Sequence, residues 1–276
     1  MLSLLHRVAL AVLFALPGGG TVLAQSGLKR LDTGIDSRGW EAVGRLDLDG
    51  RGFCTGALIE PALVLTAAHC MFDRSTGERF TPDQIEFQAG VRNGRADAYR
   101  NVRRAVLHPD YEFGTDVSPE RVRHDIALLE LYHPIRQPNI APFRMAPTPR
   151  SGDPVGVVSY AHDRADAPSL ETTCGVIAAQ QGVLVTSCDV DYGSSGAPIF
   201  SFFGGVPMIV SVVSAKAEVE GQRVALGSEL DRQIKVMKGQ LDSGLTPRNQ
   251  LTPGVRRIQV GGGRNSTGAK FITPDN

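Results

Sequence analysis

Residues 188–198 read Cys-Asp-Val-Asp-Tyr-Gly-Ser-Ser-Gly-Ala-Pro, and the rest of the chain can be read outward from them. Ser195 lies among glycines, just ahead of the apolar pair Ile199-Phe200. A reactive serine needs compact backbone on both sides, so that substrate can approach and main-chain N–H groups can point at the carbonyl under attack. Short Gly/Ser-rich strings also form ordinary turns between strands. This stretch alone therefore leaves a catalytic serine and a simple turn as alternatives.

Short apolar or alternating stretches separated by turn residues run through most of the chain, with a Pro-rich segment at 134–154 between two series. Many short strands with few helical periods predict an all-β protein made of two barrels. One helix is expected over 228–241, capped by Ser228, because apolar residues recur there at three- and four-residue spacing. Strands are expected at 40–48, 53–59, 63–66, 85–89, 100–107, 126–131, 155–159, 173–177, 183–186, 197–203, 208–214 and 223–226.

The N-terminal residues have the pattern of an export signal. Arg7 is followed by an apolar run at 8–16, a Pro-Gly break and small residues ending at Ala24. This run is too short for a membrane span, so residues 1–24 are predicted to be a cleaved signal peptide. The expected division is then a surface segment at 25–39, a first barrel at 40–140, a second barrel with the helix at 141–241, and a disordered tail at 242–276.

Composition limits the partners and the compartment. The chain of 276 residues carries 29 basic and 29 acidic residues, which gives no reason to expect nucleic acid or an anionic membrane surface as a partner. Four cysteines in an exported chain suggest two disulfides. The short-loop pairings are Cys54 with Cys70 and Cys174 with Cys188, although spacing alone allows three connectivities. No Cys-x-x-Cys pair or clustered histidine supports a metal site, and no cofactor is indicated.

A serine hydroxyl is a poor nucleophile near neutral pH and needs a histidine base held by a third group. His69 follows the apolar stretch 63–66 and stands beside Cys70. Asp125 stands at the start of the apolar stretch 126–131, where a carboxylate would be partly buried and would need hydrogen-bond donors. Separately, such residues are more often a surface histidine and a turn aspartate. Their conjunction with Ser195 favours catalysis.

Three motifs, in order, resemble those of the chymotrypsin/trypsin-like serine protease family. Residues 54–59 and 65–70 (Cys-Thr-Gly-Ala-Leu-Ile and Leu-Thr-Ala-Ala-His-Cys) resemble the catalytic-histidine region of the family. Residues 108–111 and 125–129 resemble its aspartate region, and residues 193–198 resemble its nucleophile loop. The resemblance covers roughly residues 40–241.

The resemblance implies two six-stranded antiparallel β-barrels with the active site between them. It implies a triad of His69, Asp125 and Ser195, and an oxyanion hole made by the N–H groups of Gly193 and Ser195. It further implies a serine endopeptidase, expected to be a monomer that acts on peptide or protein substrates, and the predicted signal peptide indicates that it is secreted or periplasmic. The competing hypothesis is a non-catalytic member of the family that serves as a binding or scaffold module.

The sequence departs from the family pattern at two places. Ser194 stands where most members carry an aspartate that pairs with a new amino terminus, so the usual activation by cleavage is not expected, and the chain looks more like the bacterial, glutamyl-endopeptidase-like branch. Asp189 stands where trypsin-like members place the selector for Lys or Arg. Ser214 and Lys216 lie on the strand that resembles the family's substrate-binding strand, and Lys216, with Arg223, could instead favour acidic side chains.

Overall fold

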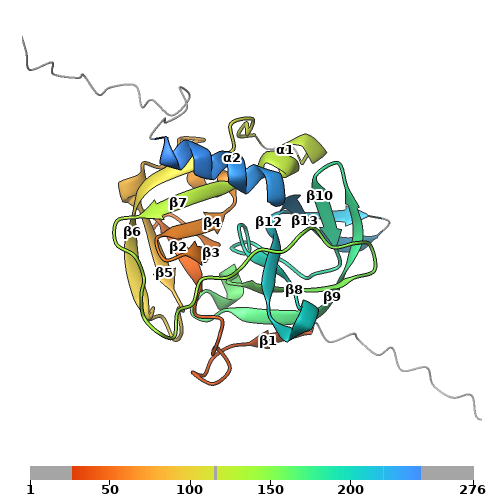
Figure 1. The fold of residues 1–276 in the computed structure, drawn as a ribbon, viewed down its shortest axis with the longest axis horizontal. Helices are drawn as coiled ribbons and strands as arrows, with labels where there is room; N and C mark the ends of the chain where they lie inside the picture. Colours follow the sequence, from red (N-terminus) through yellow and green to blue (C-terminus); the bar gives the residue numbers. More distant parts are fainter. Residues whose placement is uncertain (1–26, 115–116, 220, 244–276) are drawn as a thin grey trace, which may run out of the picture.

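The computed structural model describes residues 27–114, 117–219 and 221–243. The predicted signal peptide at 1–24 and residues 244–276 of the predicted tail lie outside the described residues. Residue 242 of that tail still belongs to the last helix. Figure 1 shows two groups of strands side by side, with that helix lying across them.

The first barrel closes on itself in the antiparallel order β2-β3-β4-β7-β6-β5. Buried and partly exposed residues alternate along β5 and most of β2, whereas β4 and the middle of β3 are buried throughout, as expected of strands around a packed interior. The strands are β2 (Val43–Leu48), β3 (Phe53–Glu60), β4 (Leu63–Thr66), β5 (Ile85–Ala89), β6 (Ala98–Leu107) and β7 (Ala127–Leu131).

The second barrel has the order β9-β10-β13-β12-β11-β8, and it closes because β8 also pairs with β9. The prediction of two six-stranded antiparallel barrels is confirmed. The strands are β8 (Pro154–Ser159), β9 (Ser169–Gln180), β10 (Val183–Thr186), β11 (Pro198–Ser201), β12 (Met208–Val219) and β13 (Gln222–Glu229).

The segment at 25–39, expected to run over the surface, contributes a strand. Strand β1 (Leu28–Arg30) pairs antiparallel with the start of β9, at the lower edge of Figure 1. Leu31, directly after it, is buried. This strand has too few residues to show an alternating pattern in the sequence. It forms because its backbone pairs with the exposed edge of β9.

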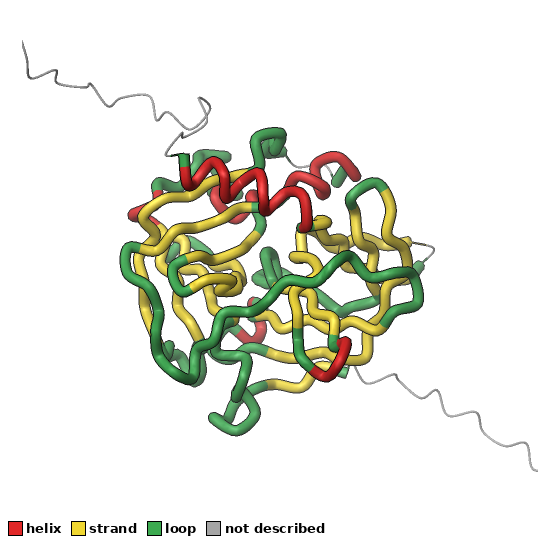
Figure 2. Tube along the Cα trace, viewed as in Figure 1, coloured by secondary structure: helices red, strands yellow, loops and turns green. Residues whose placement is uncertain are grey.

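Helices are few and short, as Figure 2 shows. The α-helices are α1 (Pro119–His124) and α2 (Asp231–Asp242), and the 3₁₀ turns are η1 (Ala68–Met71), η2 (Pro82–Gln84), η3 (His162–Arg164) and η4 (Phe203–Gly205). No helix in the described ranges is long and apolar enough to cross a membrane.

Helix α2 follows the second barrel in sequence but packs on the first. Ile234, Met237 and Leu241 are buried in the same apolar core as the first-barrel strands. The backbone carbonyl of Leu241 accepts a hydrogen bond from Arg104 of β6 at 3.1 Å. The three- and four-residue spacing of these apolar residues thus predicted a real buried face.

The predicted start of this helix is wrong. Ser228 lies in β13, where its hydroxyl donates to the carbonyl of Val122 at 2.5 Å, so it cannot cap. The helix begins at Asp231, and its N-cap residue, Leu230, makes no side-chain capping bond. Strand pairing with β10 and β12 extends β13 to Glu229 and delays the helix.

Candidate active site

His69 is held in place by a short turn that follows a fully buried strand. Strand β4 ends at Thr66, and η1 carries His69. The disulfide between Cys54 on β3 and Cys70 ties this turn to the barrel. The backbone that carries His69 is therefore held by the first barrel, and the His69 side chain is only 13% exposed.

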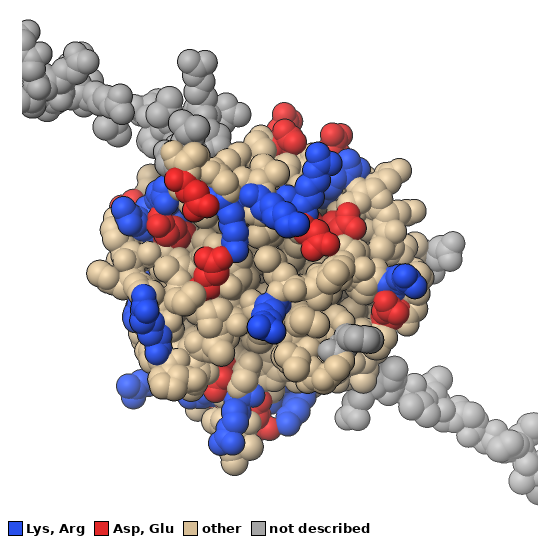
Figure 3. Space-filling model, in the orientation of Figure 1, with Lys and Arg blue, Asp and Glu red and all other residues tan. Residues whose placement is uncertain are grey.

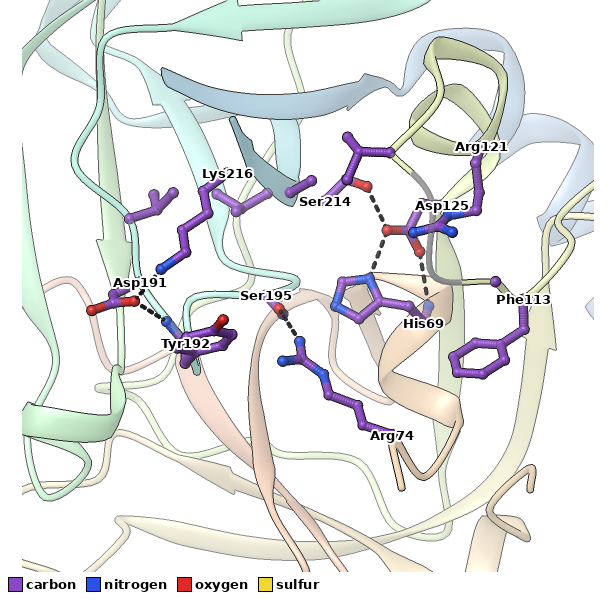
Figure 4. Close-up of a pocket in the computed structure, with 15 residues that line it drawn as sticks. His69, Arg74, Phe113, Arg121, Asp125, Asp191, Tyr192, Ser195, Ser214 and Lys216 are labelled. Carbon is purple, nitrogen blue, oxygen red and sulfur yellow. Dashed lines mark hydrogen bonds and ion pairs between the residues drawn. The ribbon is translucent and has the colours of Figure 1, made fainter. Parts of the chain in front are cut away.

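Asp125 comes from the end of helix α1, which the sequence did not predict. Ser118 caps this helix by accepting from the N–H of Arg121, and Asp125 is its C-cap residue. The carboxylate is buried, so it needs hydrogen-bond donors. It has three, as Figure 4 shows.

These donors come from two residues. One carboxylate oxygen of Asp125, Oδ1, accepts from the backbone N–H of His69 at 2.8 Å. The other, Oδ2, lies 2.6 Å from His69 Nδ1 and accepts from the Ser214 hydroxyl at 2.5 Å. A carboxylate at Nδ1 favours the tautomer that carries its proton there, which leaves the Nε2 lone pair free to accept a proton.

Ser195 lies in the loop before β11, and the first barrel holds that loop. The N–H of Thr55 donates to the carbonyl of Ser195 at 2.9 Å. The Thr55 hydroxyl donates to the carbonyl of Gly193 at 2.8 Å and accepts from the N–H of Tyr160 at 3.1 Å. Thr55 was not singled out from the sequence, because a threonine inside a strand carries no functional signal of its own.

Two glycines shape this loop. Gly193 has φ +96° and Gly196 has φ +75°, a region that only glycine adopts without strain. A side chain at Gly196 would also lie 2.4 Å from the carbonyl oxygen of Thr55. The N–H groups of Gly193 and Ser195 donate no hydrogen bond within the described ranges, so both remain available to an incoming oxygen.

The nucleophile and the histidine line one cleft without touching. Across the described residues no hydrogen bond joins Ser195 Oγ to His69. Ser195 Oγ instead accepts from Arg74 Nη2 at 3.2 Å (Figure 4). Such gaps are common in unliganded sites and close when substrate binds.

The cleft has a volume of about 430 Å³ and receives side chains from both barrels. Lys216 is at one side of it, paired with Asp191 at 2.7 Å, and its ammonium lies 4.2 Å from the centre of the Tyr192 ring. The hydrogen bond with Lys216 is the main reason that the pKa of Asp191 is lowered. The lining residues are His69, Arg74, Phe113, Gly114, Val117, Arg121, Asp125, Val190, Asp191, Tyr192, Ser195, Val213, Ser214, Ala215 and Lys216.

The structure brings Ser214 and Lys216 to this cleft but not Asp189. Asp189 lines a separate cavity of about 220 Å³. Val190 and Lys216 line both this cavity and the cleft, and so lie between the two. The Asp189 carboxylate lies 3.7 Å from Arg223. The Ser214 hydroxyl donates to Asp125, and the contact of Ser214 with substrate stays a prediction.

The four cysteines form the two short-loop disulfides. Cys54 pairs with Cys70 and Cys174 with Cys188. The second bridge holds the segment just before the nucleophile loop against β9. In the described ranges, three groups of His, Cys, Asp or Glu residues are compact enough to share a cation. Two of them contain the disulfide cysteines, which offer no thiolate as a ligand.

The third group joins His108, Asp110 and His124. The two imidazole rings stack face to face, 4.6 Å apart and 6° from parallel. His108 Nδ1 already accepts from the N–H of Asp110 at 3.2 Å. Ring nitrogens coordinate in the ring plane, so this stack is a packing contact, and we assign no metal to it.

The face drawn in Figure 3 has no large patch of charges of one sign. Basic and acidic side chains are interspersed there. This agrees with the equal counts of 29 basic and 29 acidic residues in the sequence.

Comparison with known proteins places the chain in a family. Residues 54–206 match the family model described as "Trypsin-like peptidase domain". This match covers more than half of the chain, and the chain belongs to the trypsin-like peptidase family.

Individual relatives match over shorter stretches. A trypsin from Sarcophaga bullata is 31% identical over 110 residues, which are 39% of this chain and 39% of that protein. Coagulation factor XII from Sus scrofa is 37% identical over 84 residues, 30% of this chain and 12% of that protein. The matched stretch thus spans about two fifths of the trypsin and much less of the larger relative.

A solved structure titled "Structure of Glu endopeptidase in complex with MPD" shares the fold. The TM-score is 0.64, with 16% sequence identity, and the alignment covers 80% of this chain and 99% of that one. Identity at this level supports the architecture alone.

Proposed function

We propose that this protein is an exported serine endopeptidase with Ser195 as nucleophile, His69 as general base and Asp125 as the group that orients the base. The observation that carries this proposal is the arrangement around Asp125. Its two oxygens accept from the backbone and the ring of the same histidine, in a cleft that also contains Ser195. Family membership supplies the expectation of peptide bonds as substrates.

The proposed reaction is acyl transfer. Ser195 Oγ attacks the peptide carbonyl while His69 Nε2 takes its proton, and the same nitrogen then delivers that proton to the departing amine. Asp125 holds the ring and stabilises its cation. The free N–H groups of Gly193 and Ser195 are the donors for the oxyanion, and one such donor is worth about 3 kcal/mol in related sites.

We also propose that the folded enzyme needs no cleavage to become active. Ser194 is fully buried, and its hydroxyl contacts the Ser159 hydroxyl at 3.1 Å and the Tyr160 carbonyl at 3.3 Å. This neutral network fixes the nucleophile loop with no buried carboxylate to be neutralised. Export is supported by the two disulfides and by the predicted signal peptide, which lies outside the described residues.

Labelling with a fluorophosphonate, with the adduct mapped by mass spectrometry, tests this proposal. We expect one adduct on Ser195 of the mature protein, without any cleavage beyond removal of the signal peptide. The adduct should be lost in His69→Ala and in Ser195→Ala. Circular dichroism should show that both variants are still folded. Peptide cleavage should be lost in parallel. A folded wild-type protein that forms no adduct would favour the alternative of a protease-like binding module.

A further inference from the structure

Arg74 is the feature of the cleft that the triad leaves unexplained. Its guanidinium donates to the nucleophile, Ser195 Oγ, at 3.2 Å. It also lies 5.7 Å from the centre of the Tyr192 ring. Within the described part of the chain, no carboxylate lies within ion-pair distance of it. A cation that close to a reacting atom, without an anionic partner, is open to one from the substrate.

The loop that carries Arg74 is built to hold it there. The Asp73 carboxylate accepts from the N–H and hydroxyl of Ser75 at 2.8 and 2.6 Å, and from Arg51 at 2.8 Å. The hydrogen bonds from Ser75 are the largest reason that the pKa of Asp73 is lowered. One residue earlier, Phe72 stacks on Phe113 at 4.5 Å. These contacts fix the backbone on both sides of Arg74, although its own side chain is exposed.

Arg74 stands between two cavities. The first is the cleft that holds Ser195, Ser214 and Lys216. The second, of about 510 Å³, is lined by both cysteines of the Cys54–Cys70 disulfide and by aromatic residues that include Phe53 and Phe80. His69, Arg74 and Tyr192 line both. We call the second one the disulfide-side cavity.

The direction of a bound peptide follows from the proposed reaction, on which this inference rests. Ser214 and Lys216 lie on the strand proposed to receive residues before the scissile bond, so those residues occupy the first cleft. His69 must protonate the departing amine, so the leaving group extends past His69 on the other side. That side is the disulfide-side cavity, and Arg74 stands at its mouth.

Two other cations near Arg74 already have carboxylate partners. In the disulfide-side cavity, Arg51 already pairs with Asp73 at 2.8 Å. In the cleft, Lys216 already pairs with Asp191 at 2.7 Å. A substrate carboxylate that binds either of them must displace an existing partner, whereas Arg74 gives up only a neutral hydroxyl.

We propose that Arg74 selects substrates with an acidic side chain at the first or second position after the scissile bond. The guanidinium binds the carboxylate, and the aliphatic part of the substrate side chain lies in the disulfide-side cavity, among the aromatic residues that line it. Binding draws Arg74 away from Ser195 Oγ, which frees an oxygen lone pair for attack on the carbonyl while the hydroxyl donates its proton to His69 Nε2. Recognition of the acid and release of the nucleophile are then the same movement.

The test begins with the wild-type protein and a peptide library randomised on both sides, with cleavage positions mapped by mass spectrometry. Asp and Glu should be enriched at the first or second position after the cut. Two internally quenched fluorogenic peptides are then compared, one with Glu and one with Gln at the enriched position and otherwise identical. The measured quantity is the ratio of their kcat/KM values, Glu over Gln. We expect about tenfold in favour of Glu, the size of one charge-assisted hydrogen bond.

Variants assign the preference to Arg74. Arg74→Gln should bring the Glu/Gln ratio to about one, and Arg74→Glu should favour a Lys peptide over the Glu peptide. Arg103→Gln is the matched control, since Arg103 is an exposed arginine on β6 outside both cavities, and its Glu/Gln ratio should equal that of wild type. Circular dichroism of each variant confirms folding.

Three results would overturn the inference. Cleavage without acidic enrichment, or enrichment that survives in Arg74→Gln, would refute the role of Arg74 while leaving the peptidase proposal intact. A folded wild-type protein with neither cleavage nor a fluorophosphonate adduct would refute the peptidase proposal, and this inference with it.

Discussion

Replacing Asp125 by asparagine tests the hydrogen bonds on which the proposed mechanism depends. One carboxylate oxygen faces the backbone N–H of His69, and the other faces His69 Nδ1 and the Ser214 hydroxyl. An amide offers one acceptor and one donor end. Whichever way it turns, its NH₂ faces His69, either at the backbone N–H or at the ring.

The two orientations have different costs. With NH₂ toward the backbone N–H, two donors would meet across 2.8 Å in a buried site, an arrangement that costs about 1–3 kcal/mol. With NH₂ toward the ring, Nδ1 must become the acceptor, and the proton moves to Nε2. His69 could then no longer accept the proton of Ser195. We expect the second orientation and a fall in kcat of about 10⁴-fold, the size found for the same substitution in a related triad, with a small change in KM.

The assay is steady-state cleavage of a fluorogenic peptide, together with thermal unfolding of each variant. Ser214→Ala is the graded control, because it removes one donor and leaves the carboxylate and the tautomer intact; it should lower kcat about 10-fold to 100-fold. A folded Asp125→Asn protein within tenfold of wild-type kcat would refute the proposed role of Asp125.

Three further predictions concern the framework. Thr55→Val removes the hydroxyl that donates to the Gly193 carbonyl and should lower the free energy of unfolding by about 1–3 kcal/mol, measured by urea titration; an unchanged midpoint would contradict it. Gly196→Ala should reduce the yield of fluorophosphonate adduct at least tenfold, because its Cβ meets backbone and the residue has positive φ, and full labelling would count against this. Burial, with the neighbouring charge of His124, lowers the pKa of His108; below about pH 6.5 the unfolded chain therefore binds a proton that the folded chain does not, and the free energy of unfolding decreases as the pH is lowered. His108→Asn should show a smaller loss of unfolding free energy between pH 7 and pH 5 than wild type, and equal losses would contradict the assignment.

Much of the architecture could be predicted because it depends on local patterns. Each expected strand overlaps an observed one, since apolar stretches broken by turn residues report burial directly. Strand β1 and helix α1 escaped because three and six residues are too few to establish a period. The start of helix α2 was misplaced because Ser228, a good cap by type, is claimed by a strand.

The site divides in a similar way. Three ordered motifs predicted which residues would meet, and the structure brings His69, Asp125 and Ser195 to one cleft. The sequence could not show that Asp189 lies behind Lys216, because that depends on where a flexible side chain finds its partner. Arg74 carries no motif at all. Its contact with Ser195 arises because the fold brings a loop of the first barrel to the nucleophile loop of the second.

Helix α2 has a consequence for how the protein is made. The first barrel has all its strands by residue 131, yet its core is completed by apolar side chains at 234–241. At ribosomal speeds, the intervening stretch takes on the order of ten seconds to synthesise, during which that apolar surface is uncovered. A chain truncated before α2 would therefore expose this apolar surface and tend to aggregate. A chain exported while unfolded would form its cleft only after export. Because α2 is made last, the core of the first barrel is completed only after the rest of the described chain has been synthesised.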